Sequence, residues 1–233
     1  MDKFLSIIIP AYNETERIRQ SLESACDYLN NKGYKYEIIV VDDGSSDDTV
    51  AIAKAFGGNV SVLSQSSNMG KGAAVRRGML TATGDIRIFT DADFSTPIYE
   101  IEKILPKIEA GADICIGSRA LDPSMIKEHQ PFYREFMGKT FNQFVQVLFF
   151  KGISDTQCGF KGFTRAAAEK IFLKAKINGF SFDVELLYLA SKAGLRVEQV
   201  SVEWYNDARS KVNPVKDSLM MLIELFRIKR IHR

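Results

Sequence analysis

Short apolar runs alternate along the first half of the chain with longer stretches in which apolar residues recur every three or four positions. The runs have strand length: Phe4–Ile9, Tyr36–Val41, Val60–Leu63, Ile86–Phe89 and Asp113–Ile116. Helices are predicted to begin near Glu14, Asp47, Lys71 and Pro97. Because parallel strands need crossover connections of this length, the pattern predicts an α/β fold with a mainly parallel, Rossmann-like central sheet flanked by helices.

Two of these helix starts carry residues that favour helix initiation. Ser46-Asp47-Asp48 supplies polar capping side chains, and Ser95-Thr96-Pro97 supplies caps and a proline at the first helical position.

The second half of the chain has a different pattern. We predict a polar loop at Leu121–Gln130, a long aromatic-rich helix at Pro131–Phe150 and a turn-rich stretch at Lys151–Lys161. A helix at Asp183–Ala193 and a strand at Val197–Val202 follow. A polar loop at Tyr205–Asn213 then leads to a final helix from Pro214 to about Ile231. There is no internal repeat and no low-complexity linker. We therefore divide the chain into one α/β domain, residues 1–213, and a C-terminal amphipathic basic helix, residues 214–233.

Composition narrows the class of protein. With 233 residues, of which 45% are hydrophobic, the chain is long enough for one sizeable domain. The formal net charge of +2 gives no global field that would attract nucleic acid, so no nucleic-acid partner is expected. Three widely spaced cysteines fit a reducing compartment and provide no disulfide or zinc framework. The N-terminal apolar run is too short for a signal peptide, and no run approaches the roughly 20 apolar residues of a membrane span.

Carboxylates directly after predicted strands are the main candidates for chemistry. Asp91 and Asp93 are two positions apart at a strand end, so both can face one divalent cation. Hard oxygen ligands suit Mg²⁺ or Mn²⁺. The alternative is that the pair caps the helix near Pro97, and in isolation the two interpretations carry about equal weight.

Other strand ends are also polar, which favours a ligand site. Pro10–Glu14 and Asp42–Ser45 follow two further strands, and in parallel sheets such ends surround one crevice. A fourth loop, Asn68–Gly72, offers Lys71 as a cation, but it matches neither the Walker pattern nor the dinucleotide fingerprint, which disfavours NTPases and dehydrogenases. With only two histidines and no obvious partners for them, serine and cysteine hydrolases are also disfavoured.

Arginines are the candidates for binding phosphate. Arg119 lies just past a predicted strand, where it could meet a phosphate, although a plain surface ion pair remains an alternative. Arg134, Arg196, Arg209 and Lys211 are weaker candidates individually.

Together these residues closely resemble the family-two inverting glycosyltransferases of the GT-A fold, in the branch that contains dolichyl-phosphate glucose and mannose synthases. The segments that carry the resemblance span almost the whole chain: Ile7–Glu14, Val40–Thr49, Asn68–Gly78, Asp91–Ser95, Gly117–Arg119 and Asp155–Phe163. The resemblance implies the following groups of site residues. The nucleoside would be held by Pro10, Tyr12, Glu14, Val41 and Asp43, and the metal by Asp91 and Asp93. Arg119 and Arg134 would approach the phosphates, while Arg196 and Lys211 would close over donor or acceptor. The further substrate-binding candidates are Lys71, Ala92 and Asp155.

Within this branch the resemblance favours glucose as the transferred sugar. Mannose synthases of the family carry Gln two residues after the second metal aspartate, whereas this chain has Ser95. The segment Asp155–Lys161 is also similar to dolichyl-phosphate glucose synthases, which implies UDP-glucose as the donor.

The acceptor determines which catalytic groups are needed. A phosphate monoester has a second pKa near 6, so it can attack without a strong general base. We therefore expect cations near the acceptor, in-line displacement and inversion at the anomeric carbon. A saccharide hydroxyl would instead need a base, for which Asp155 and Asp183 are the carboxylates to watch.

Two stretches fit a substrate at a membrane surface. Phe132–Phe150 is rich in phenylalanine, and Leu219–Arg233 places basic residues after an apolar set. We expect a peripheral protein at the cytosolic face of a membrane, or one with a membrane protein partner. An ordinary core helix or a homo-oligomer interface would give the same pattern. Two other functions remain open: transfer to a saccharide hydroxyl in glycan or cell-wall assembly, and a non-catalytic nucleotide-sugar-binding scaffold.

Overall fold

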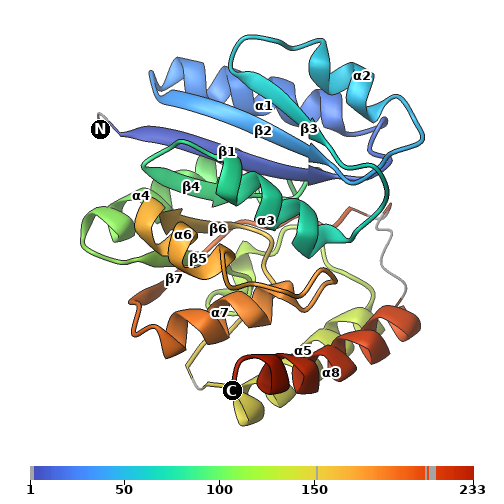
Figure 1. Cartoon of the computed structure of the whole chain (residues 1–233), viewed down its shortest axis with the longest axis vertical. Helices are drawn as coiled ribbons and strands as arrows, with labels where there is room; N and C mark the ends of the chain where they lie inside the picture. The colour runs from blue at the N-terminus through green and yellow to red at the C-terminus, as the bar shows by residue number, and fades with distance from the viewer. Residues whose placement is uncertain (1–2, 151, 208, 210–213) are drawn as a thin grey trace.

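The computed structural model describes residues 3–150, 152–207, 209 and 214–233. Its centre is a seven-stranded sheet in the order β3-β2-β1-β4-β6-β5-β7 (Figure 1). The strands are β1 Phe4–Ala11, β2 Lys35–Asp42, β3 Val60–Ser64, β4 Ile86–Phe89, β5 Ile114–Ser118, β6 Lys161–Thr164 and β7 Val197–Ser201. The predicted α/β fold and all six predicted strands are thereby confirmed.

One strand, β6, was not predicted from the sequence. It lies between β4 and β5 and runs antiparallel to both, whereas all other pairs in the sheet are parallel. Its four residues, Lys161-Gly-Phe-Thr164, contain no apolar run and follow a turn-rich stretch, so periodicity gave no signal for a strand. As a result, the first residue of β6 lies at the same edge of the sheet as the last residue of β4, because Phe89 pairs with Lys161.

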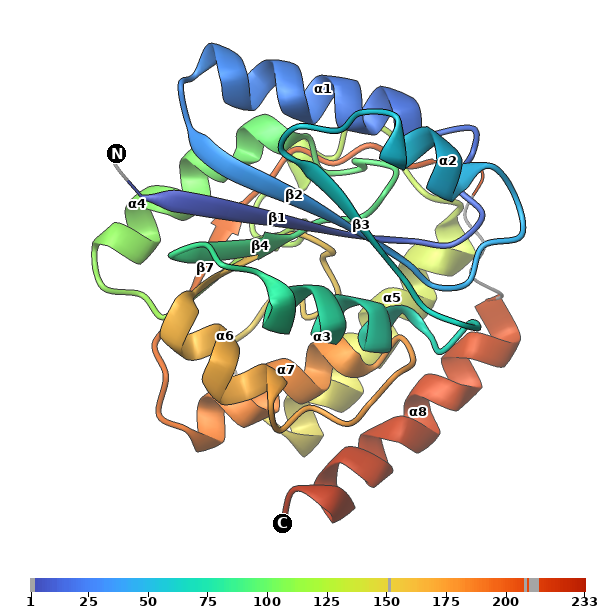
Figure 2. The ribbon, with the colours of Figure 1, turned by 45° about the horizontal axis from the view of Figure 1, so that its top comes forward.

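Helices cover both faces of the sheet (Figure 2). One face packs against α1, α2 and α4, whose bounds are Ile18–Asn31, Thr49–Lys54 and Ile101–Glu109. The other face packs against α3, α5, α6, α7 and α8, whose bounds are Lys71–Thr81, Phe132–Leu148, Arg165–Phe172, Phe182–Lys192 and Pro214–Ile231. Side chains of β1 alternate between the two cores, with Ile8 in one and Ile7 and Ile9 in the other, as a sheet covered on both faces requires.

Several predicted helix starts are displaced. The helix expected near Glu14 begins at Ile18, because the residues before it form a turn in which the Glu14 carbonyl accepts from the Arg17 and Ile18 amides. Asp48 precedes α2 without a side-chain cap; Asp47 instead accepts from the amide of Thr49. Pro97 is the N-cap of the short 3₁₀ turn Ile98–Glu100 that leads into α4, rather than the first helical residue we predicted.

The last part of the chain adds three further helices to the core. Helix α6 was missed by the sequence analysis, whereas α7 and α8 confirm the predicted helices. Met221, Leu225 and Ile228 of α8 are buried in the same core as α5 and α7, and α8 contacts α5 directly. A second 3₁₀ turn, Pro123–Met125, interrupts the predicted polar loop.

All three cysteines are free thiols, and Cys115 and Cys158 are buried. Burial raises the pKa of Cys115 to about 12 and that of Cys158 to about 11, which keeps both thiols protonated. Within the described residues, no helix combines the length and the apolarity needed to cross a membrane.

Candidate functional site

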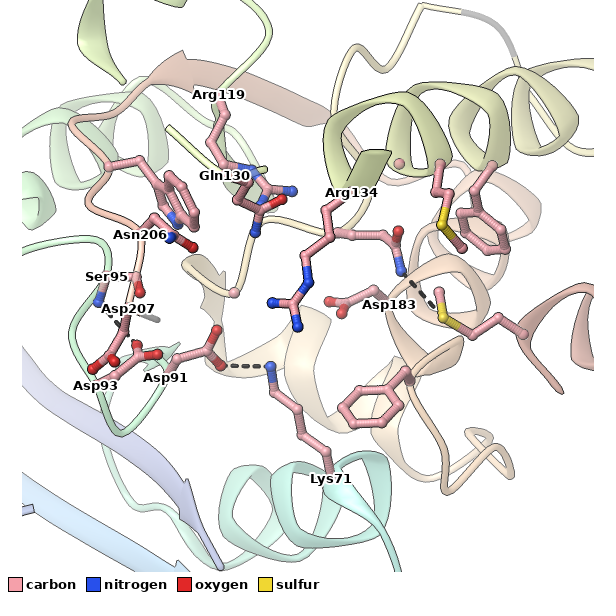
Figure 3. A pocket seen from close by; sticks show the side chains of 18 residues that line it. Lys71, Asp91, Asp93, Ser95, Arg119, Gln130, Arg134, Asp183, Asn206 and Asp207 are labelled. Carbon is pink, nitrogen blue, oxygen red and sulfur yellow. Dashed lines mark hydrogen bonds and ion pairs between the residues drawn. The ribbon is translucent and has the colours of Figure 1, made fainter. Parts of the chain in front are cut away.

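Several of the candidate residues meet at one edge of the sheet, around a cavity of about 270 Å³. This edge holds the carboxyl ends of β1, β2, β4, β5 and β7 together with the beginning of β6, as expected for ligand sites of open α/β sheets. Figure 3 shows side chains from these segments converging on the cavity. The predicted residues that line this main cavity are Lys71, Asp91, Asp93, Arg119 and Arg134, joined by Asp183.

One side of the main cavity, which we call the acidic wall, consists of Asp91 and Asp93 in the turn after β4. Lys71, at the start of α3, places its Nζ 2.5 Å from Asp91 Oδ1 (Figure 3). The Asp91 carboxylate also lies directly against the backbone of Gly159, where any side chain would collide with it. The chain around Asp91 is therefore built to hold a carboxylate in one place.

The turn that carries the acidic wall has a strained backbone. Phe94, the residue after Asp93, has a φ of 47°, in the left-handed region that side chains rarely adopt. The amide of Ser95 donates to Asp93 Oδ1 at 2.9 Å, and this bond fixes the carboxylate within the turn. Strain of this kind persists only where the surroundings over-determine the conformation, and it is common at functional sites.

The charges of the acidic wall and of the adjacent Lys71 shift one another's pKa values. Burial lowers the pKa of Lys71, but the carboxylates of Asp91 and Asp183 outweigh that effect, so the pKa lies above its ordinary value and the lysine stays protonated. Burial and the neighbouring Asp91 raise the pKa of Asp93. A cation bound between the two carboxylates would relieve this repulsion.

The opposite side of the main cavity, the arginine wall, consists of Arg119 after β5 and Arg134 on α5. Arg119 donates from Nε and Nη2 to the two oxygens of Asp155, at 2.7 and 2.9 Å, and its guanidinium lies over the ring of Trp204. Burial opposes ionisation of Asp155, yet Arg119 lowers its pKa to about 2. The same pairing raises the pKa of Arg119 against the effect of burial. Asp155 therefore orients Arg119 and is a very weak base.

A second cavity of about 340 Å³ adjoins the main one behind the arginine wall. Arg119 and Arg134 line both cavities, as do Gln130 and Trp204. The second cavity is also lined by Pro123 and Ile126, on the segment after β5, and by residues of α5. The two arginines thus stand between two adjoining cavities and face both.

Asp183 lies between the two walls, at the start of α7. Its Oδ1 is 2.6 Å from Nζ of Lys161, a fully buried lysine that also donates to the carbonyl of Cys158. Burial raises the pKa of Asp183, although Lys161 and Lys71 both counteract this effect. Lys161 was missed because it lies on the unpredicted strand β6, and a lone lysine in a turn-rich stretch gave no signal.

The residues that we predicted to hold a nucleoside lie beside the acidic wall. Pro10 and Val41 pair across β1 and β2, and Tyr12, just past β1, is 38% exposed. Val41 is fully buried, backbone included, so no part of it is exposed to a ligand in this structure.

Asp43 and Ala92 have structural contacts that position neighbouring loops. Asp43 accepts from the amides of Met69 and Gly70, and these bonds hold the loop in front of Lys71. Ala92 is buried, and its carbonyl accepts from Ser21. Both residues therefore fix the backbone around the acidic wall.

Glu14 reveals a second residue that the sequence analysis missed, Arg17. The guanidinium of Arg17 binds Oε2 of Glu14, at 2.7 Å from Nε and 2.5 Å from Nη2. It also lies 3.6 Å from Asp93 Oδ2 and 3.2 Å from Asp207 Oδ2. An arginine near a helix start gave no sequence signal, because its partners are distant in the chain.

Of the predicted residues that the structure describes, Arg196 lies farthest from the site, at the opposite edge of the sheet. Arg196 precedes β7, pairs with Glu198 and donates to the carbonyl of Ala110. The prediction that Arg196 closes over a substrate is therefore wrong: a residue at the amino end of a parallel strand is separated from the site by the length of that strand. Lys211 lies outside the described residues.

The acidic wall fits a divalent cation, but only as part of a larger ligand set. Its oxygen donors are of the kind that Mg²⁺ and Mn²⁺ prefer, and the fixed position of Asp91 against Gly159 leaves its carboxylate facing the cavity. In the described part of the chain, no group of three or more histidine, cysteine or acidic side chains could hold a metal. Phosphate oxygens and water would have to complete the coordination.

Comparison with known proteins adds two kinds of finding. Residues 6–172 match the model of the family described as Glycosyl transferase family 2. The dolichyl-phosphate beta-glucosyltransferase of Dictyostelium discoideum is 39% identical over 241 residues, which cover 97% of this chain and 74% of that protein. The protein of the same name from Drosophila melanogaster is 38% identical over 240 residues, covering 96% and 74%.

Solved structures agree on the fold. The crystal structure of glucosyl-3-phosphoglycerate synthase from Mycobacterium tuberculosis, in complex with Mn²⁺, UDP and glucosyl-3-phosphoglycerate, superposes with a TM-score of 0.72. It is 19% identical, and the match covers 97% of this chain and 80% of that one.

Proposed function

The chain belongs to glycosyl transferase family 2, and we propose that it transfers glucose from UDP-glucose to a polyprenyl or dolichyl phosphate, with inversion at the anomeric carbon. The observation that carries this proposal is the main cavity itself, in which two carboxylates face a pair of arginines. One wall suits the leaving diphosphate with its cation, and the other suits an anionic acceptor. The names of relatives such as that from Dictyostelium discoideum support the choice of sugar and lipid.

On the donor side, Asp91 and Asp93 would hold Mg²⁺ or Mn²⁺, and Lys71 would bind the diphosphate. A bound divalent cation would neutralise charge on the departing diphosphate. Mn²⁺ and UDP are present in the mycobacterial neighbour, which supports the same kind of ligand here. Pro10, Tyr12, Glu14 and the segment around Asp43 would hold the nucleoside, because they lie beside the acidic wall at the ends of β1 and β2.

On the acceptor side, Arg119 and Arg134 would bind and orient the phosphate. The second cavity behind the arginine wall gives an acceptor a route to these arginines that does not cross the donor wall. A phosphate oxygen attacks the anomeric carbon as the bond to the diphosphate breaks, so the product has inverted configuration. No strong base is needed, and Asp155, whose pKa is lowered to about 2 by Arg119 despite burial, is poorly suited to be one.

Transfer to a saccharide hydroxyl is the second candidate, and Asp183 is the observation that favours it. Burial raises the pKa of this cavity carboxylate, as a general base requires. Against this role, Asp183 is bound to the buried Lys161. The variant Asp183→Asn separates the two: transfer to a phosphate would lose activity only through altered positioning, whereas transfer to a hydroxyl would lose nearly all of it.

We also propose that α5 and α8 rest on a membrane surface at its cytosolic face. Exposed apolar side chains lie on both helices: Phe132, Phe136, Phe144, Val147, Leu219, Met220, Ile223 and Phe226. Arg227 and Arg230, also exposed, follow on α8, and each such basic residue contributes about 1 kcal/mol near an anionic bilayer. Residues 1–213 would then form the catalytic domain, with the final helix, residues 214–233, as a membrane-facing element.

Sedimentation with vesicles tests this surface. Wild-type protein should pellet with vesicles that contain anionic lipid, and Phe136→Ser together with Phe226→Ser should weaken that binding. Leu173→Ser is a matched control, because Leu173 is 74% exposed but lies at the end of α6. If the protein is a stable dimer in solution and the paired substitutions dissociate it, the same face is a homo-oligomer interface. If the protein pellets only with vesicles that contain a membrane protein, the face binds that partner.

The activity is tested by turnover of labelled UDP-glucose or GDP-mannose with short-chain polyprenyl phosphate in detergent and, in parallel, with a saccharide acceptor. Lipid-soluble label from UDP-glucose that disappears with EDTA is the expected result. Label from GDP-mannose alone would keep the mechanism and change the sugar. Label in a saccharide product would favour the second candidate, and donor binding with no transfer to any acceptor would indicate a scaffold.

A further inference from the structure

We propose that Arg17 is a positioning residue, which holds Asp93 of the acidic wall and the segment after β7 in the arrangement that binds a nucleotide with its metal. The inference rests on the proposed function, because it assumes that Asp93 faces a metal. It concerns a residue that touches no substrate itself and acts through three carboxylates from distant parts of the chain.

The contacts of Arg17 are unusual for a residue at a helix start. Its side chain is 9% exposed, and it faces Glu14, Asp93 and Asp207, whose side chains are 11%, 20% and 15% exposed. Nε and Nη2 bind Glu14, while Nη1 points toward Asp93 and Asp207. One guanidinium therefore contacts three acidic groups, from the turn after β1, the turn after β4 and the segment after β7, and Asp207 also pairs with Arg209.

The geometry requires arginine rather than lysine. A guanidinium presents donors in a rigid, planar fork, so it can bind one carboxylate with two nitrogens and still offer the third nitrogen to others. A lysine ammonium is a single point charge and would have to choose among the three. Without Arg17, Asp207 would keep its pair with Arg209, but Glu14 and Asp93 would lose this cation and the repulsion among the three carboxylates would increase.

The link to Asp207 extends this effect to the wall of the main cavity. Trp204, Asn206 and Asp207 line that cavity and belong to one segment (Figure 3). The segment is fastened at two points near the acidic wall: the amide of Tyr205 donates to the carbonyl of Ser95, and Asp207 pairs with Arg17. Loss of Arg17 would remove one of these fastenings and allow Trp204 to shift away from Arg119.

Arg17 also lies between two hollows of the surface. It lines a third cavity of about 600 Å³ together with Glu14 and residues 46–48, while its Nη1 faces Asp93 and Asp207, which line the main cavity. The nucleoside-side residue Glu14 and the metal-side residue Asp93 are thus connected through a single side chain. This placement explains why a buried cation beside a metal site can favour binding: it fixes two parts of the site relative to each other.

A purely structural role for Arg17 predicts something different, namely a loss of stability with no specific loss of binding. Arg87 provides the matched comparison, because it is also a buried arginine, with 3% exposure, and pairs with Glu169 away from the main cavity. Arg87→Gln therefore reports what the loss of any buried guanidinium does to this fold.

The experiment is calorimetric titration of the 233-residue chain with UDP in the presence of Mn²⁺, and with Mn²⁺ alone. We expect Arg17→Gln to weaken UDP–Mn²⁺ binding by about tenfold, as the loss of a charge-assisted contact would. Arg17→Lys should recover only part of this loss. Asp207→Asn should weaken binding by a smaller factor, and the double variant Arg17→Gln/Asp207→Asn should bind no more weakly than Arg17→Gln alone.

Wild-type affinity in Arg17→Gln, fully multiplicative losses in the double variant, or an equal loss in Arg87→Gln would each overturn the inference. If Arg17→Gln does not fold, Asp207→Asn carries the test, and unchanged binding in that variant overturns the inference too. A wild-type protein that binds neither UDP nor GDP with Mn²⁺ would instead contradict the proposed function, so the two failures are distinguishable.

Discussion

The acidic wall and the arginine wall of the main cavity are built in different ways. The acidic wall stands on a short turn between a buried strand and a packed helix, and it is held by Lys71, by the backbone of Gly159 and by Arg17. The arginine wall stands on a long segment after β5 and on α5, whose 17 residues include only two buried ones, Phe141 and Val145. The acidic wall, our proposed donor side, is therefore fixed by the core of the fold, whereas α5, which carries part of the proposed acceptor side, has few buried residues.

The largest loss of activity is expected from a substitution in the acidic wall. Asp93→Ala should reduce metal-dependent turnover by about 10³-fold, because the loss of a metal ligand removes several kcal/mol of stabilisation of the leaving group. The fold should remain largely intact, which a melting curve can verify. Asp85→Ala is the control, since Asp85 pairs with Arg165 at the opposite edge of the sheet. Unchanged turnover in Asp93→Ala would remove the metal assignment.

A smaller loss of activity is expected from a substitution in the arginine wall. Arg119→Ala should raise the KM for polyprenyl phosphate by roughly 10- to 100-fold, in line with about 1.5–3 kcal/mol for a charge-assisted hydrogen bond. The affinity for UDP with Mn²⁺ should change little, and this difference separates the two walls. Initial rates at varied acceptor concentration measure it. A variant with wild-type acceptor kinetics would show that Arg119 only anchors Asp155.

The ion pair in the arginine wall should also make stability depend on pH. Because Arg119 lowers the pKa of Asp155 from 3.8 to about 2 despite burial, the ionised carboxylate stabilises the fold above about pH 4. This contribution, about 2 kcal/mol, should disappear as the pH falls toward 2. Urea unfolding of wild type and Asp155→Asn at pH 6 and pH 3 tests it. The difference between the two proteins should shrink at the lower pH, and a constant difference would contradict the pairing.

Asp47, in the first half of the chain, provides an internal control for this test. Burial raises the pKa of Asp47, but hydrogen bonds from Thr49 and Thr15 lower it to about 2. In Arg119→Ala, carbon-detected NMR titration should show a higher pKa for Asp155 and the same pKa for Asp47. Equal shifts at both carboxylates would indicate a global change of the fold rather than loss of one partner.

The smallest effect is expected from Arg196→Ala, with less than about twofold change in kcat/KM, because surface ion pairs contribute little. Arg196 lies at the opposite edge of the sheet with Glu198. A loss comparable to that of Arg119→Ala would mean that the segment around Arg196 moves during turnover.

Features encoded by neighbouring residues could be predicted from the sequence, whereas contacts between distant residues could not. The acidic wall was predictable because Asp91 and Asp93 directly follow an apolar run, so strand and turn were both encoded locally. The partners of Arg17 were not, because they lie 76 and 190 positions further along the chain, at Asp93 and Asp207. Lys161 and β6 were missed for a related reason: β6 lacks the apolar run that identified the equally short β4, and it is defined by pairing with β4 and β5.

The antiparallel strand β6 has a consequence for how the protein folds. Strands β1 to β4 are complete by residue 89, but the edge of β4 is covered only when residues 161–164 insert beside it. Until then a growing chain exposes unpaired backbone groups along β4, which is the kind of edge that invites intermolecular pairing. We therefore expect the slow step of folding, and the period of greatest risk of aggregation, to be the insertion of β6, which also brings Gly159 against Asp91 and completes the site.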